Sequence, residues 1–394
     1  MGDSAIHHVF PYDPEHLGVS LDQWWRGQLQ RWPLAAVART TQASRSIVHV
    51  IASRSDVLHD RPQTPLRLVV HRTLYSNARR HAWGDDWALS LGRALRRTGP
   101  DDVVVVHQEG YAAGRLTMRY AHHARCVYVM HGRGASSLPV HEAADYSVVL
   151  NDDARDEMRA MGVPDSRVRQ VVPSIDRTLF GPPGRSADLG LGREQGREQG
   201  REQVVGCLGR IDPGKGIFEL PDILRALADL DVRLELVGSP TDEAVARRVD
   251  EAFAGLPVDV LGELSPEQVS ARMKVWTAMV MPSYAEGMPI SALEALSSGV
   301  QLVGVTGVIP RSMAQRRGAL VGPRESLAER VREALTQPQE TETDWIPDHS
   351  DGARTWEEIY AALPSWRPRF RPSARPLVGR LTRMRRPRWA APSR

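Results

Sequence analysis

Two glutamates lie eight residues apart in the segment Glu286-Gly-Met-Pro-Ile-Ser-Ala-Leu-Glu294. Pro289 fits the first position of a helix and Gly299 fits the residue just past its end, so Glu286 is predicted on a loop and Glu294 inside the helix. At about 1.5 Å per residue the two positions are roughly 12 Å apart. A hydrolytic carboxylate pair needs roughly 5–9 Å, so the spacing suits two separate contacts on one long ligand. An ordinary exposed helix is the alternative, and spacing alone favours it; the flanking glycine and proline favour a binding site.

A glycine-rich loop upstream carries two cations, in the segment Gly209-Arg210-Ile-Asp-Pro-Gly-Lys215-Gly216. Lys215 is one of only two lysines in the chain; the other is Lys274. Glycines let a backbone approach phosphate closely, and a compact ammonium on a flexible stem suits a diphosphate. The pattern is neither Gly-x-Gly-x-x-Gly nor a P-loop. Two solvated loop cations are the alternative; the glycines favour an anion site.

Backbone donors and one histidine extend this candidate site. The N–H groups around Gly287, Met288 and the residue after Pro289 can meet hydroxyl or phosphate oxygens at a helix N-terminus. His131 follows an apolar strand, and the C-terminal ends of parallel strands face the crevice where α/β sheets bind ligands. A structural histidine at a strand end is the alternative for His131. His107, at the end of the preceding strand, is a weaker candidate.

The sequence predicts no required metal. The segment Asn151-Asp152-Asp153 follows a strand, but Asn151 or Asp152 is better explained as the cap of a helix that begins near Ala154. No cluster of cysteine and histidine has the spacing of metal ligands. The only cysteines, Cys126 and Cys207, lie in apolar runs and are expected to be buried free thiols in a reducing cytoplasm.

The elements that must position these residues alternate along the chain. Its 394 residues favour two domains. Apolar runs typical of strands alternate with helical patterns, which predicts parallel sheets in two doubly wound α/β domains. The expected strands lie at 46–52, 66–70, 103–107, 126–130, 146–150 and 168–172, then at 204–209, 233–237, 258–261, 278–281 and 302–305. Helices are expected at 21–39 and 86–97, among others.

Composition sets the remaining boundaries. We expect an N-terminal domain at 1–175, a crossover linker with a Gly-Arg-Glu-Gln repeat at 176–203, and a C-terminal domain at 204–345. An amphipathic helix follows at 351–363, with apolar residues at helical spacing. Residues 364–394 are rich in proline and arginine and are expected to be disordered. The start does not resemble a signal peptide, and no apolar run is long enough to span a membrane.

Five segments in the right order resemble the retaining, GT-B-fold glycosyltransferases of family 4. They are Tyr128-Val-Met-His131-Gly132, Val172-Pro-Ser-Ile-Asp176, the Gly209–Gly216 loop, the Glu286–Glu294 pair and the helix around Trp356. The resemblance covers nearly the whole chain and is strongest from about 145 to 363. It implies two Rossmann-like domains that face each other across a cleft, and a C-terminal helix that packs back across the domains.

The resemblance also implies roles. Arg210 and Lys215 would hold the diphosphate of a nucleotide-sugar donor, Glu294 the ribose, Glu286 the donor sugar, and His131 the sugar near the reacting carbon. The family's N-terminal Gly-Gly pair is reduced here to Gly18, and the segment Gly304-Val-Thr-Gly307 also lacks the usual glycine pair. The resemblance assigns phosphate and acceptor contacts to those two loops.

The resemblance implies a retaining, metal-independent transfer from a nucleotide-diphosphate sugar to a glycan, lipid-linked or small-molecule hydroxyl, with no cofactor. An epimerase or sugar phosphorylase on the same fold, or a degenerate sugar-nucleotide-binding protein, remains an alternative. Residues 365–394 hold ten arginines and no acidic residue. Such a segment suits an anionic membrane surface, so a cytoplasmic protein at the inner face of the membrane is one expectation. A tail without a role is the other, and nucleic acid is not expected as a partner.

Overall fold

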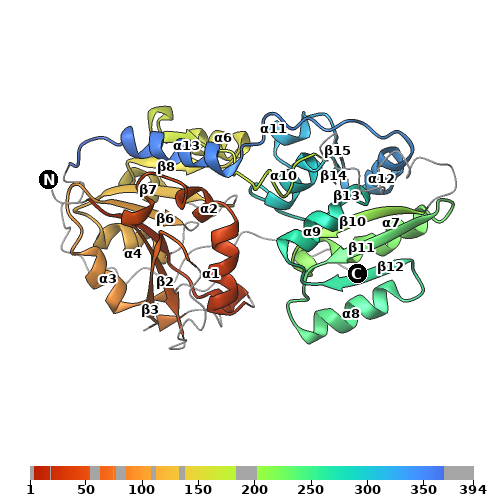
Figure 1. The fold of residues 1–394 in the computed structure, drawn as a ribbon, viewed down its shortest axis with the longest axis horizontal. Coiled ribbons are helices and arrows are strands. Elements are labelled where there is room, and N and C mark those ends of the chain that lie inside the picture. The colour runs from red at the N-terminus through yellow and green to blue at the C-terminus, as the bar shows by residue number, and fades with distance from the viewer. Residues whose placement is uncertain are drawn as a thin grey trace.

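The computed structural model describes residues 4–17, 19–53, 63–73, 75–76, 86–107, 112–132, 138–182 and 202–367. Within these residues the chain forms two α/β domains that lie side by side (Figure 1). Most of the repeat segment and the end of the basic tail lie outside the described residues, as does Gly18.

The first domain is built on a parallel sheet of seven described strands in the order β3-β2-β1-β6-β7-β8-β9. Most of these strands are buried along their length, as expected for a sheet covered on both faces. The strands are β1 (Ile6–Phe10), β2 (Ser46–Ala52), β3 (Arg67–Arg72), β6 (Val103–His107), β7 (Arg125–Met130), β8 (Tyr146–Val149) and β9 (Val168–Gln170). After β3 in the sequence, β4 (Tyr75–Ser76) and β5 (Asp86–Trp87) form a separate antiparallel pair. The helices are α1 (Leu21–Gln30), α2 (Leu34–Val37), α3 (Leu89–Leu95), α4 (Ala112–Tyr120), α5 (Leu138–Ala143) and α6 (Asp152–Ala160).

The second domain repeats this plan with six described strands, all parallel, in the order β12-β11-β10-β13-β14-β15. The strands are β10 (Gln203–Leu208), β11 (Val232–Val237), β12 (Val258–Gly262), β13 (Trp276–Met281), β14 (Gln301–Val305) and β15 (Ala319–Gly322). The helices are α7 (Leu220–Ala226), α8 (Glu243–Phe253), α9 (Pro266–Met273), α10 (Ile290–Ser297), α11 (Arg311–Ala314) and α12 (Leu327–Thr336). The fold class predicted from the strand–helix alternation is therefore confirmed.

The sequence-based expectation was wrong for two helices and missed two strands. The helix expected at 21–39 is divided into α1 and α2, because Pro33 has no backbone N–H with which to continue α1. The helix expected at 86–97 is shorter: Asp86 and Trp87 form β5, and α3 begins only at Leu89. Strands β1 and β15 were not predicted at all, although β1 pairs with both β2 and β6 near the middle of the first sheet.

The last described helix, α13 (His349–Ala361), follows the second domain in sequence but packs on the first (Figure 1). Trp356 on α13 is fully buried, and its ring lies against those of Trp32, His8 and His107. The backbone N–H of Thr41 also donates to the Glu357 carboxylate. Because a buried tryptophan excludes much apolar surface from water, this helix ties the two halves of the chain together.

Candidate functional site

The glycine-rich loop after β10 folds against the loop after β13. Gly216 has a φ of +68°, and a Cβ atom there would lie 2.1 Å from the Pro282 carbonyl oxygen, so only glycine fits. The N–H of Tyr284 donates to the Gly214 carbonyl at 3.0 Å. These contacts bring the cations of the first loop next to the carboxylate of the second.

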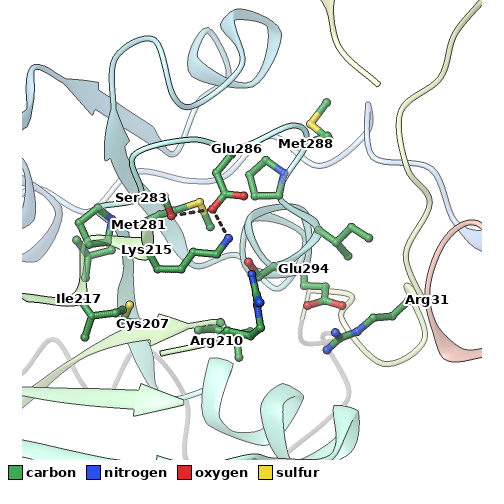
Figure 2. Close-up of a pocket in the computed structure, with 17 residues that line it drawn as sticks. Arg31, Cys207, Arg210, Lys215, Ile217, Met281, Ser283, Glu286, Met288 and Glu294 are labelled. Carbon is green, nitrogen blue, oxygen red and sulfur yellow. Dashed lines mark hydrogen bonds and ion pairs between the residues drawn. The ribbon is translucent and has the colours of Figure 1, made fainter. Parts of the chain in front are cut away.

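Lys215 and Glu286 form an ion pair in this position. Lys215 Nζ lies 2.7 Å from Glu286 Oε1, and the Ser283 hydroxyl donates to the same oxygen at 2.7 Å (Figure 2). The Glu286 side chain is only 11 % exposed, whereas that of Lys215 is 29 % exposed. The ammonium is therefore the more accessible partner, although its charge is balanced in the protein without ligand.

Arg324 holds the loop that carries Glu286. Its guanidinium donates to the carbonyls of Pro282 and Ser283 at 2.6 and 2.8 Å, and it also pairs with Glu219 at 2.8 Å. Its guanidinium carbon lies 4.0 Å from the centre of the Tyr284 ring. Because a guanidinium offers several donors in a rigid fork, one side chain fixes two consecutive carbonyls.

Glu294 occupies a different environment on α10. Pro289 is the N-cap of this helix rather than its first residue, and Gly299, with a φ of +76°, follows its C-terminal end. The Glu294 side chain is 5 % exposed. Burial raises the pKa of its carboxyl group to about 7, and the charge of Arg31 opposes that rise. Among the described residues, no hydrogen bond reaches this carboxylate.

These side chains share a pocket of about 340 Å³ (Figure 2). Arg31, at the end of α1, is the lining residue that comes from the first domain. The lining residues are Arg31, Cys207, Leu208, Gly209, Arg210, Lys215, Ile217, Val280, Met281, Pro282, Ser283, Glu286, Met288, Pro289, Ile290, Ser291 and Glu294. The pocket thus brings three cations, Arg31, Arg210 and Lys215, together with a protonatable carboxyl group on α10. This arrangement suits an anion joined to hydroxyl groups.

Seven residues predicted for the site line this pocket: Gly209, Arg210, Lys215, Glu286, Met288, Pro289 and Glu294. Gly287 and His131 do not line it, but they meet beside it. A Cβ atom at Gly287 would lie 1.9 Å from the His131 carbonyl oxygen, so the two backbones are in close contact. His131 is therefore next to the pocket, at the junction of the two domains.

Further polar contacts close this junction. Asn151 Nδ2 donates to the Gly287 carbonyl at 2.6 Å, while its Oδ1 accepts from Ala154 as the cap of α6. The N–H of Ser312 donates to Asp152, and Arg311 contacts Asp153 at 2.7 Å. Across the part of the chain that the structure describes, no group of three metal-binding side chains is placed to hold an ion.

Two other rings lie beside the His131 imidazole. Its Nε2 lies 3.3 Å from Nδ1 of His107, and the centre of the Trp32 ring is 5.4 Å away. Burial lowers the pKa of His131 to about 4. It is therefore neutral near physiological pH.

Sequence reasoning missed Arg31, Ser283 and Arg324. Arg31 follows Trp24-Trp25 in a first-domain segment with no recognisable motif, so only the packing of the domains reveals its position. The roles of Ser283 and Arg324 become clear only in the folded structure, where Ser283 contacts Glu286 and Arg324 contacts the loop that carries it. For Ser283, the one available signal was a polar side chain two residues after the end of a buried strand.

Comparison with known proteins finds a family match in the second half of the chain. Residues 192–349, which are less than half of the chain, match the model of the Glycosyl transferases group 1 family. A D-inositol 3-phosphate glycosyltransferase of Mycobacterium tuberculosis is 31 % identical over 175 residues, or 42 % of this chain and 34 % of the relative. The chain thus spans about a third of the length of the curated relatives it matches.

Solved structures match over both domains. Anabaena Alr3699/HepE, in complex with UDP and glucose, superposes with a TM-score of 0.63 at 14 % identity, covering 91 % of this chain and 100 % of that one. A sucrose-phosphate synthase from Thermosynechococcus elongatus gives 0.56 at 19 % identity, covering 92 % and 95 %. The chain therefore has the GT-B fold, and its residues 192–349 match the group 1 glycosyltransferase domain.

Proposed function

We propose that this chain, with its group 1 domain on a GT-B fold, transfers a sugar from a nucleoside-diphosphate sugar to an acceptor hydroxyl. The observation that carries the proposal is a single pocket lined by Arg210, by the ion pair of Lys215 with Glu286, and by the buried Glu294 on α10. The diphosphate would contact the cations, the ribose hydroxyls would donate to Glu294, and the sugar would lie beside Glu286. These residues all fall within the matched segment 192–349.

The chemistry follows from where charge develops. As the bond between the anomeric carbon and the phosphate oxygen breaks, negative charge grows on the departing diphosphate. Fixed cations stabilise that charge more in the transition state than in the ground state. Lys215 and Arg210 supply them without a metal ion. Because Glu286 holds Lys215 in advance, little reorganisation is needed when the diphosphate forms a second contact with the ammonium.

We propose further that the transfer retains the anomeric configuration. Glu286 Oε1 already accepts from both Lys215 and Ser283, which makes that oxygen a poor nucleophile. Attack of the acceptor from the face that the diphosphate leaves is then the favoured course. The acceptor oxygen forms the new bond to the anomeric carbon, and its proton passes to the departing phosphate oxygen.

Replacing Lys215 by alanine tests the site. Lys215→Ala is expected to lower kcat about 100-fold, because a cation at the leaving group is lost. The dissociation constant of the donor should change less than about tenfold, since Arg210 and Glu294 remain. Release of nucleoside diphosphate, followed with and without acceptor, measures the rate and separates transfer from acceptor-independent reactions.

The matched control for this variant is Lys274→Ala, which removes the only other lysine of the chain from the exposed end of α9. It should leave both constants unchanged. Equal kinetics for the two lysine variants would remove Lys215 from the catalytic site.

The acceptor remains a glycan, a lipid-linked sugar or a small molecule, and we propose that it binds mainly to the first domain. No helix among the described residues is long and apolar enough to cross a membrane. We also propose that the arginine-rich tail, which lies largely outside the described residues, holds a cytoplasmic protein to anionic lipid.

Deleting residues 368–394 tests the tail. This truncation keeps Trp366, whose Nε1 donates to the His122 carbonyl at 3.0 Å. It should abolish low-salt sedimentation with anionic liposomes and leave turnover of a soluble acceptor unchanged. Neutral liposomes, which neither chain should bind, are the control. Retained binding to anionic liposomes after truncation would end the membrane proposal.

A further inference from the structure

Three histidines and a tyrosine form a continuous hydrogen-bonded row that ends at His131. The Tyr360 hydroxyl on α13 lies 3.2 Å from His8 Nε2. His8 Nδ1 lies 2.9 Å from His107 Nε2, and His107 Nδ1 lies 3.3 Å from His131 Nε2. The histidines come from β1, the end of β6 and the residue after β7, which are neighbouring strands of the first sheet. The row thus runs from the buried face of α13 to the domain junction.

All three histidines are neutral. Burial lowers the pKa of His8 to about 3 and that of His131 to about 4, and it lowers the pKa of His107 well below its usual value. A neutral imidazole has one N–H donor and one acceptor nitrogen. Each histidine in the row can therefore donate in only one direction, and every bond in the row must run the same way.

Tyr360 sets that direction. Its hydroxyl is buried, and burial raises its pKa well above the usual value, so it keeps its proton. Among the described residues, His8 is the partner seen for this hydroxyl. If the row ran from His131 towards Tyr360, the tyrosine would accept from His8 and its own proton would be left without an acceptor. An unsatisfied buried donor is unfavourable, so Tyr360 donates and the row runs towards His131.

We propose that Tyr360, His8 and His107 are positioning residues that fix His131 as the tautomer protonated on Nδ1. Its Nε2 accepts from His107, and Nδ1–H is left as a hydrogen-bond donor beside the pocket. His131 then serves a substrate oxygen, either a hydroxyl or a phosphate oxygen, as a donor and not as a general base. This role rests on the proposed function, whereas the tautomer itself does not.

Nitrogen NMR of the full chain measures the tautomer directly, because protonated and unprotonated imidazole nitrogens have well-separated shifts. His131→Gln identifies the His131 signals by their loss. In the wild-type protein at neutral pH, Nδ1 of His131 should be protonated and Nε2 unprotonated. In Tyr360→Phe the first donor is missing, so the row can reverse and Nε2 should gain protonation.

Tyr146→Phe is the matched control. The Tyr146 hydroxyl also bonds to the end of the α13 region, donating to the Ala362 carbonyl at 2.6 Å, but it takes no part in the row. Its loss should leave the His131 shifts unchanged. A wild-type His131 protonated on Nε2, or identical His131 shifts in the two tyrosine variants, would overturn the proposal.

Kinetics separate this proposal from the proposed function. If both hold, Tyr360→Phe should lower kcat about tenfold, the effect of losing one hydrogen bond to the transition state, with little change in the KM for the donor. A protein that shows the expected tautomer but turns over no nucleotide sugar would retain the positioning network and lose the proposed function. An active enzyme in which His131 is protonated on Nε2 would support the proposed function and contradict the positioning network.

Discussion

Glu294→Gln is expected to stabilise the free protein above neutral pH and to weaken nucleotide binding about 100-fold. Burial raises the pKa of this carboxyl group from 4.5 to about 7. Between those values the folded chain holds a proton that the unfolded chain has released, so this group makes stability rise as pH falls. Above about pH 7 the buried carboxylate is ionised, and its contribution destabilises the fold. Glutamine removes that contribution.

Thermal unfolding over a range of pH tests this expectation. The melting temperature of Glu294→Gln should exceed that of the wild type most clearly above pH 7, and the difference should vanish below about pH 4.5. Glu251→Gln, at an exposed position on α8, is the control and should follow the wild type. A difference that does not depend on pH would contradict the assigned environment of Glu294.

The loss of binding has a separate cause. A carboxylate can accept from two ribose hydroxyls, whereas an amide offers one acceptor oxygen and two N–H donors. Hydrogen bonds to a charged group contribute about 1.5–3 kcal/mol, which corresponds to the expected loss in affinity. The same side chain is therefore expected to reduce the stability of the free protein and to be required for its ligand, as is common at functional sites.

Gly287→Ala is the second change with a large expected effect, a fall in turnover of about 100-fold or more. The added Cβ would lie 1.9 Å from the His131 carbonyl oxygen and 3.1 Å from Gly132 Cα. Both are backbone atoms, so no side-chain rotation relieves the contact. The first domain must move away, and misplacement of reacting groups by about 1 Å can cost about 100-fold in rate.

The affinity for nucleotide distinguishes a specific loss of turnover from general disruption of the fold. The lining of the pocket lies mainly in the second domain, so Gly287→Ala should still bind nucleoside diphosphate within about tenfold of the wild type. Gly27→Ala, on α1, meets no atom within 4 Å and should leave both binding and turnover intact. Full turnover in Gly287→Ala would show that the contact between Gly287 and His131 is not needed for the reaction.

Local patterns in the sequence predicted the fold class, because each strand between helices has its own apolar run. β1 was not predicted, because His7 and His8 interrupt its apolar pattern. Both are buried in the folded protein, where His7 bonds to His49 at 2.9 Å and His8 joins the row to His131. A polar residue that is satisfied by a distant partner cannot be distinguished from a surface residue in one sequence.

The candidate site shows the same limit. Arg210, Lys215 and Glu286 were found because each has a glycine beside it, and Glu294 because it lies in a helical segment bounded by Pro289 and Gly299. Arg31 reaches the pocket from the other domain, and the pKa of Glu294 depends on how deeply α10 is buried. Both properties arise from packing between distant segments, which spacing along the chain does not record.

Calorimetric titration of the wild-type chain with UDP, GDP, ADP and TDP, in the presence of a metal chelator, tests the central claim most directly. The account predicts that at least one of these nucleotides binds with one site per chain, and that Glu294→Gln weakens that binding. A folded protein that binds none of the four nucleotides or their common sugar conjugates would contradict the assignment of the pocket to a nucleotide-sugar donor.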